Sequence, residues 1–115
     1  MSRGFKSLRF LLIYKRARIW VMRRFEWDDG KAQSNLEKHG VGFEEASLVF
    51  DNPVAVIFPD DAHSDFETRE ILLGHTKNGI LLLVSFVERE LGVVRIISAR
   101  VATKKEEVMY VEHLR

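Results

Sequence analysis

The sequence predicts an α+β fold with the element order β-α-α-β-β-β-β-α, an antiparallel meander sheet and helices packed on one face. Three observations indicate it: two helical patterns in the first half, a run of strand patterns joined by short turns, and a helix-capping pattern near the C-terminus. Helices and strands segregated in this way are typical of α+β folds. A chain of 115 residues suits one domain with a single core.

The first half begins with a short strand at 24–27. Asp28 and Asp29 can cap a helix that runs to Lys38, because a carboxylate there accepts hydrogen bonds from free amides and suits the helix dipole. Gly40 ends this helix, since glycine adopts the left-handed turn at low cost. Apolar residues then repeat at helical spacing over 43–50 and predict a second helix, which Asp-Asn-Pro ends.

The second half is predicted to hold four strands. Residues 54–58 form the first, and the acidic, polar loop DDAHSDFETRE follows it. Residues 70–76 and 80–88 form a hairpin, because Asn-Gly between them is a strong turn signal. The segment ILLLVSFV is apolar on both faces, so it is expected at the centre of the sheet. A tight turn then leads into the last strand, 93–99.

The chain ends in a predicted helix. Thr103 and Glu106 form a capping-box pattern, and the helix runs to about Leu114. With helices on one face of the sheet, the other face is expected to be a partly open, polar floor on which a ligand can sit.

Residues 1–21 differ from the rest. They combine a basic start with an apolar patch, but Arg9 interrupts the patch and no small-residue cleavage site follows, which argues against a secretory signal. We expect an extension outside the core, with a domain at 22–115. A surface amphipathic helix or a basic arm is the alternative. No apolar run approaches the roughly 20 residues that a membrane span needs.

The net charge of +1 hides a division along the chain. Residues 1–24 hold eight Lys/Arg and no acid, which leaves 25–115 with 10 basic and 17 acidic residues, a net charge of −7. Within that part, 25–70 carry −9 and 71–105 carry +4. A polyanion such as RNA is repelled by the first and tolerated by the second. Any nucleic-acid site is therefore expected in the C-terminal half.

Metal and thiol chemistry find little support in the sequence. The absence of cysteine excludes disulfides, thiolate zinc sites and cysteine nucleophiles. The four histidines are scattered, and Asp60, Asp61 and His63 make at best a weak loop site. No metal or other cofactor is predicted.

Three segments resemble, in order, the toxins of the BrnT family. The usual BrnT sequence opens with a strand, a WD turn, a helix ending in KHG, then FEEA and a VFDDP-like stop. The same order of motifs is found here in FEWDDGKAQSNLEKHGVGFEEASLVFDNP. The family's ER…IG…G…LLVV…TER hairpin is similar to ETREILLGHTKNGILLLVSFVERE, and its RIISAR ending to VVRIISARVATKKEEVMY. The resemblance covers roughly residues 23–112. KHG-x-x-FEEA together with RIISAR is specific.

The resemblance implies a RelE-like fold and a ribonuclease toxin of a type II toxin–antitoxin system. Such a toxin cleaves RNA without a metal, inhibits translation and growth in the cytoplasm, and is neutralised by its antitoxin. The implied partner is a BrnA-like antitoxin with a ribbon-helix-helix domain, in a complex of two toxins and two antitoxins. Operator DNA is then contacted only through the antitoxin.

Metal-free RNA cleavage needs a base for the 2′-OH proton, cations for the charged phosphorane and an acid for the leaving 5′ oxygen. Arg95 and Arg100 are candidate cations, because a strand that only fills a core would not carry them and guanidinium fits phosphate well. Five positions apart on a regular strand, they point to opposite faces, so both reach one site only if the strand twists or ends before Arg100. The alternative for Arg95 is an ion pair with Glu88 or Glu90.

Other candidates have a structural alternative too. Arg69 matches the family's ER pair, or forms a salt bridge with its acidic neighbours. Glu88 is a possible base, an orienter of an arginine, or a solvated turn residue. Tyr110 can donate a proton or stack on a base, or it is a half-buried packing residue. His39 can transfer protons or simply stabilise a helix end. Two exposed lysines in the first turn of the last helix are candidate RNA-binding residues: Lys104 and Lys105.

The acidic first half suits a basic partner segment better than it suits RNA. Six carboxylates are therefore expected to contact the antitoxin: Glu44, Glu45, Asp60, Asp61, Asp65 and Glu67. An alternative function from another class is a non-catalytic protein-binding module that acts as partner or co-repressor of the antitoxin, which the net charge of −7 favours.

Overall fold

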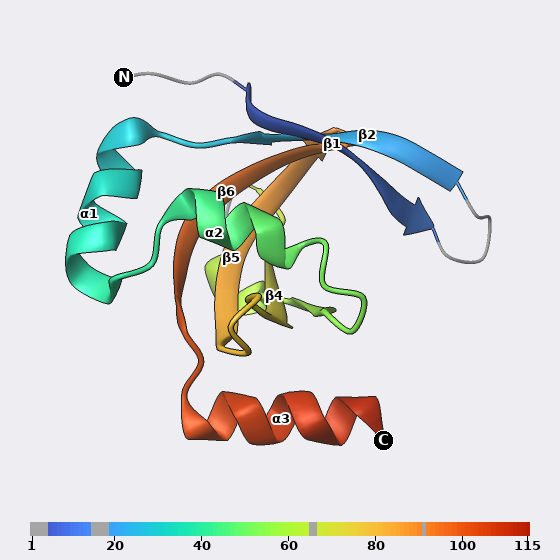
Figure 1. Ribbon diagram of the computed structural model, residues 1–115, viewed down its shortest axis with the longest axis vertical. Coiled ribbons are helices and arrows are strands. Elements are labelled where there is room, and N and C mark those ends of the chain that lie inside the picture. Colours follow the sequence, from blue (N-terminus) through green and yellow to red (C-terminus); the bar gives the residue numbers. More distant parts are fainter. Residues whose placement is uncertain (1–4, 15–18, 65–66, 91) are drawn as a thin grey trace.

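The computed structural model describes residues 5–14, 19–64, 67–90 and 92–115, with side chains from Arg23 onward. The described residues form one mixed sheet of six strands in the order β1-β2-β6-β5-β4-β3. In Figure 1, α2 lies in front of this sheet, α1 to its left and α3 below its end. The strands are β1 (Phe5–Tyr14), β2 (Ile19–Glu26), β3 (Val56–Pro59), β4 (Glu70–His75), β5 (Leu81–Glu90) and β6 (Val93–Val101). The helices are α1 (Asp29–His39), α2 (Phe43–Val49), α3 (Lys104–Leu114) and the 3₁₀ turn η1 (Asp61–His63).

The α+β class and the antiparallel meander β3-β4-β5-β6 are confirmed. Residues 5–14 form strand β1, which pairs with β2, so the alternative of a surface helix is wrong for these residues. The expected domain start at Met22 falls within β2. The prediction that residues 1–21 lie outside the core depends on side chains beyond the described part, so it stays a prediction.

Local signals place the helix ends as predicted. The Asp28 carboxylate accepts a hydrogen bond from the Gly30 amide at 2.8 Å, and Gly40 ends α1 with a φ of 67°. At the start of α3, Thr103 and Glu106 each accept a hydrogen bond from the other's backbone amide, which completes the capping box. These contacts satisfy amides that a helix end leaves without partners.

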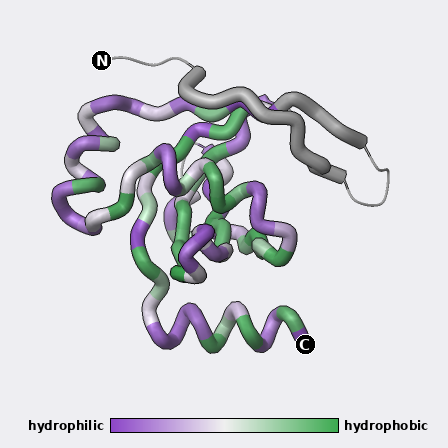
Figure 2. The backbone as a smooth tube through the Cα atoms, in the orientation of Figure 1, coloured by the Kyte–Doolittle hydropathy of each residue, from purple (hydrophilic) through white to green (hydrophobic). Residues whose placement is uncertain are grey.

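The main core lies between α1, α2 and one face of the sheet. Phe50, at the end of α2, joins the helix to the sheet in this core. The centroid of its ring lies 5.1 Å from that of Phe25 and 5.0 Å from that of Phe86, both in edge-on contact. Even-numbered residues of β5 join this core, while Leu81 and Leu83 join a smaller cluster on the opposite face. The central strand is therefore apolar on both sides, as predicted, and Figure 2 shows hydrophobic colour along the central strands.

The third helix departs from the predicted single-sided packing. Tyr110 of α3 is buried with Leu73, Leu81 and Leu83, on the face opposite α1 and α2. Its hydroxyl donates to the Val54 carbonyl at 2.7 Å. The helix covers only one end of this second face, so the remainder stays open. Nowhere in the described part of the chain is a helix both long and apolar enough to cross a membrane.

Candidate functional site

A β-bulge in β6 brings the two predicted arginines to one face. Ile96 pairs with Phe86 and Ser98 with the adjacent Ser85, so Ile97 is an extra residue in β6. Arg95 therefore stands opposite Val87 and Arg100 opposite Leu83. Those two partners are four apart on β5, so they share a face. The expectation that Arg100 lies past the strand end is wrong, because β6 continues to Val101 and the bulge supplies the change of phase.

That face carries a pocket of about 370 Å³, open on one side. It lies on the open part of the second sheet face, beside the start of α3. The loop before β4, strands β4, β5 and β6, and α3 all contribute to its lining: Asp60, His63, Arg69, Ile71, Leu83, Ser85, Ile97, Ser98, Arg100 and Glu106. The polar floor expected from the sequence therefore exists and holds Arg69 and Arg100 together.

Arg100 is held by a carboxylate of α3. Its two terminal nitrogens each donate to a different oxygen of Glu106 at 2.8 Å. These hydrogen bonds lower the pKa of Glu106 from 4.5 to about 2, and they raise the pKa of Arg100 above its ordinary value. The guanidinium is thus fixed in the pocket and always charged.

His63 faces the same pocket and has an orienting partner. Its Nδ1 lies 3.0 Å from both carboxylate oxygens of Asp60. The Ser64 hydroxyl donates to the Asp60 carbonyl at 2.8 Å and accepts from the Arg69 amide at 2.9 Å. The loop that carries His63 is therefore tied to Arg69. Sequence reasoning considered His63 only as a metal ligand, although its spacing of three from Asp60 was the available signal.

Arg95 lies beyond the pocket on the same face and is partly exposed. Among the described residues, Arg95 forms no ion pair with Glu88 or with Glu90, so the structural alternative for Arg95 is not found. Arg69 likewise forms no salt bridge with Glu67 or Glu70 among those residues, and Glu67 lies 3.7 Å from Arg89 instead. Both arginines are therefore free of the local pairing that the sequence left open.

Three candidate proton-transfer residues lie away from the pocket. Glu88 stands two positions from Phe86, on the face of the main core, and accepts from the Gly92 amide at 3.4 Å. His39 is exposed at the last position of α1. Tyr110 is buried, with its hydroxyl bonded to Val54, and burial raises its pKa, so it stays protonated at neutral pH.

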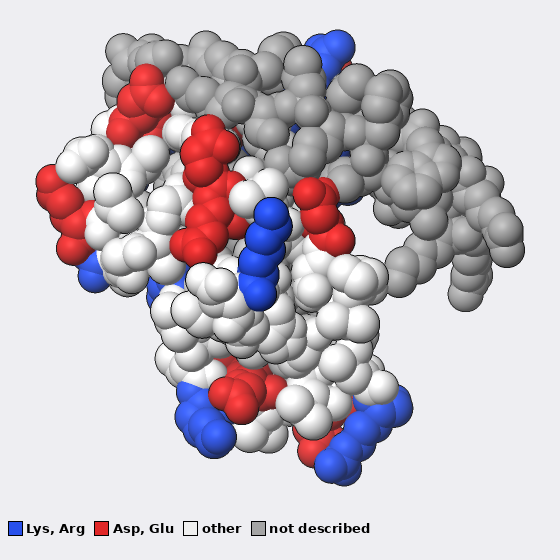
Figure 3. Space-filling model, in the orientation of Figure 1, with Lys and Arg blue, Asp and Glu red and all other residues white. Residues whose placement is uncertain are grey.

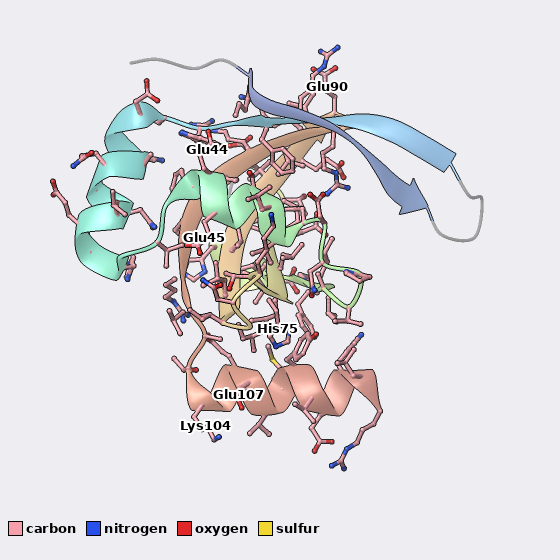
Figure 4. All side chains as sticks on the ribbon, viewed as in Figure 1. Glu44, Glu45, His75, Glu90, Lys104 and Glu107 are labelled. Atoms are coloured by element: carbon pink, nitrogen blue, oxygen red, sulfur yellow. The ribbon has the colours of Figure 1, made fainter. Side chains whose placement is uncertain are left out.

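Lys104 and Lys105 are exposed at the start of α3, where Lys104 lies 3.7 Å from Glu107. Figure 4 shows Lys104 and Glu107 on the side of α3 that points away from the sheet. Neither lysine lines the pocket.

The acidic residues predicted to contact the antitoxin divide between two surfaces. Glu44 and Glu45 are exposed on α2, which covers the other face of the sheet (Figure 4), and acidic side chains gather over this helix in Figure 3. Asp60, Asp61 and Glu67 belong to the loop between β3 and β4, beside the pocket. Asp65 lies outside the described residues.

A second hollow, of about 420 Å³, lies between α2 and the turn after β4. Its lining includes Glu45, Asp51 and His75. Among the described residues that line this hollow, Lys77 is the single lysine or arginine. This mixture is poorly suited to a phosphate, so the smaller pocket with its two arginines is the better candidate site. Across the described residues, no three His, Asp or Glu side chains are grouped so that they could hold a metal ion.

Comparisons with known proteins identify the family and the fold of the chain. Residues 27–106 match the family described as ribonuclease toxin, BrnT, of type II toxin-antitoxin system. The fold is similar to the crystal structure of the Brucella abortus ribonuclease toxin BrnT, with 26% sequence identity and a TM-score of 0.54, over 68% of this chain and 94% of that one. A comparison with curated protein sequences finds no match. The chain belongs to the BrnT family of ribonuclease toxins of type II toxin–antitoxin systems.

Proposed function

We propose that the pocket beside α3 cleaves single-stranded RNA without a metal ion. One observation carries the proposal: Arg69, Arg100 and a histidine oriented by Asp60 line the same pocket. Two guanidinium groups can bind and neutralise a phosphodiester, and imidazole can accept and donate a proton at physiological pH. This combination meets the needs of RNA cleavage through the 2′-hydroxyl.

His63 is the proposed base. With Nδ1 bonded to Asp60, the Nε2 lone pair is free to accept the 2′-OH proton. The 2′ oxygen then bonds to phosphorus, the bond from phosphorus to the 5′ oxygen breaks, and that oxygen takes a proton from water. The products are a 2′,3′-cyclic phosphate and a 5′-hydroxyl. Arg69 and Arg100 stabilise the additional negative charge of the phosphorane.

Arg95 is the proposed contact for a neighbouring nucleotide. The β5 residues opposite Arg95 and Arg100 are Val87 and Leu83, which are four positions apart. At the usual rise of a strand, this corresponds to about 13 Å along the sheet. Lys104 and Lys105, exposed at the start of α3, are proposed to contact RNA outside the pocket. Their charge and that of Arg95 offset the acidic character of the first half.

Such cleavage would inhibit translation and growth in the cytoplasm until the antitoxin binds. We propose a ribbon-helix-helix antitoxin that holds two toxin chains through its own dimer. Membership of a type II toxin–antitoxin family supports a protein partner.

The test is cleavage of a labelled single-stranded RNA in excess EDTA by His63→Gln, with His39→Gln as the matched control. His39 is exposed on α1, behind the opposite face of the sheet. We expect His63→Gln to lose about 10²- to 10⁴-fold in rate, the usual contribution of general acid–base catalysis, and His39→Gln to match the parent.

End-group analysis of the products completes the test. A 2′,3′-cyclic phosphate with a 5′-hydroxyl supports the proposal. A 5′-phosphate product, or activity abolished by EDTA and restored by Mg²⁺, would point to metal-assisted hydrolysis instead. No cleavage by the parent chain would favour the non-catalytic binding module.

A further inference from the structure

Among the described residues, no strand pairs with β6 beyond Arg95 on the side of β2, so the segment that carries Arg100 has a strand on one side only. Strand β2 pairs with β6 only through Arg24–Glu26 opposite 93–95. The chain then leaves the sheet for α1, while β6 continues through the bulge at Ile97 to Val101. Buried backbone groups on this edge need other partners, because an unpaired buried amide or carbonyl is costly.

Asn35 of α1 supplies those partners at Ala99. Its Nδ2 donates to the Ala99 carbonyl at 2.8 Å, and its Oδ1 accepts from the Ala99 amide at 3.1 Å. The same Nδ2 donates to the Val41 carbonyl at 3.0 Å, which fixes the side chain in its turn. Asn35 is buried and Ala99 is fully buried. One side-chain amide thus does for Ala99 what a paired strand would do.

The two attachments bracket the bulge. Strand β2 holds β6 at Arg95, Asn35 holds it at Ala99, and the extra residue Ile97 lies between them. A slip of one residue in a strand turns every side chain to the opposite face. Such a slip after Ile97 would turn Arg100 away from the pocket and toward the face that α1 and α2 cover.

We propose that Asn35 is a positioning residue for RNA cleavage, which acts by fixing the register of β6 so that Arg100 faces the pocket. The inference rests on the proposed function of that pocket. Asn35 touches no substrate in this account, since its amide is fully used by Ala99 and Val41.

The test is Asn35→Ala, read by two signals that loss of stability alone does not move. The first is the NMR titration of Glu106, whose pKa of about 2 depends on the hydrogen bonds from Arg100. We expect it to rise toward 4.5 in the variant, because Arg100 leaves the carboxylate. The second is cleavage of single-stranded RNA well below the melting temperature. We expect kcat to fall about 100-fold with a smaller change in KM, the effect of misplacing a catalytic group.

Two further variants sharpen the second signal. Adding Arg100→Ala to Asn35→Ala should cost little more than Asn35→Ala alone, because both changes remove the same interaction. Val49→Ala is the matched control, since Val49 is buried in α2 and its loss destabilises the core without touching β6 backbone groups. It should leave the Glu106 titration and kcat as in the parent.

An unchanged Glu106 titration in Asn35→Ala, with kcat equal to that of Val49→Ala, would reduce Asn35 to a structural residue and overturn the proposal. If Asn35→Ala does not fold, Asn35→Ser takes its place, because its hydroxyl is neutral, buries no charge beside the Ala99 and Val41 carbonyls, and cannot replace all three hydrogen bonds of the Asn35 amide. If the parent chain cleaves no RNA, the proposed function fails, while the Glu106 titration still decides whether Asn35 positions Arg100.

Discussion

The ion pair between Arg100 and Glu106 makes a quantitative prediction for Glu106→Gln. Hydrogen bonds from Arg100, together with smaller contributions from Thr103, lower the pKa of Glu106 from 4.5 to about 2. Because one pKa unit corresponds to about 1.4 kcal/mol, the whole change is worth roughly 3 kcal/mol. The Arg100 side chain is 35% exposed and that of Glu106 21% exposed, so solvent screening reduces the figure. We expect Glu106→Gln to lower the free energy of unfolding at pH 7 by about 1–2 kcal/mol.

The pH dependence tests the cause of that loss. The carboxyl pKa is lower in the folded state, so its stabilisation is present above pH 4.5 and lost as the pH falls toward 2. Urea unfolding should therefore show a difference between parent and Glu106→Gln that shrinks over this range. Tyr110→Phe is the control, because it removes a hydrogen bond to the Val54 carbonyl and no group that titrates between pH 2 and pH 7, so its loss should not depend on pH. A difference that is the same at pH 7 and pH 2 would refute the ion-pair reasoning.

Three further predictions follow from single contacts. Tyr110→Phe should cost about 1–2 kcal/mol in urea unfolding, because it leaves the Val54 carbonyl unpaired, and should not change RNA cleavage; a large loss of cleavage would restore Tyr110 as a catalytic candidate. Gly74→Ala should cost about 1–3 kcal/mol in the same assay, because its Cβ would lie 2.7 Å from a Val49 methyl, and an unchanged midpoint would contradict this close packing. Changing Asp61 and Glu67 to Lys should slow antitoxin association about tenfold at low salt, measured by stopped-flow mixing. An association rate equal to that of the parent would show that the loop is only solvated surface. Asp60 stays in place there because it holds His63.

Local signals in the sequence predicted the elements that depend on local contacts. Asp28, Gly40 and Thr103 mark helix ends through hydrogen bonds that span only a few residues, so their positions were readable. The Asn-Gly turn fixed the hairpin for the same reason. Strand β1 was missed, because a basic and apolar segment at the chain start carries no turn signal that distinguishes a strand from a tail.

The candidate site depended on contacts between distant segments, and there the sequence was a weaker guide. Arg69, Arg95 and Arg100 were predicted as a group, yet the bulge that sets the phase of β6 is a property of its pairing with β5. Asn35 reaches Ala99 across 64 positions, so no local pattern marks it. Glu88 and Tyr110 matched family motifs, but the alternation of a strand and the packing of a helix place both outside the pocket.

The most direct test of the account compares two double variants of equal charge change in single-turnover cleavage of a single-stranded RNA. Arg69→Ala/Arg100→Ala removes both pocket cations, whereas Arg89→Ala/Arg115→Ala removes two exposed cations elsewhere and lowers the general attraction for RNA equally. We predict a loss of at least about 10³-fold for the first pair, in line with removal of electrostatic transition-state stabilisation, and less than about tenfold for the second. Equal losses for the two pairs would contradict the claim that this pocket is where the RNA is cleaved.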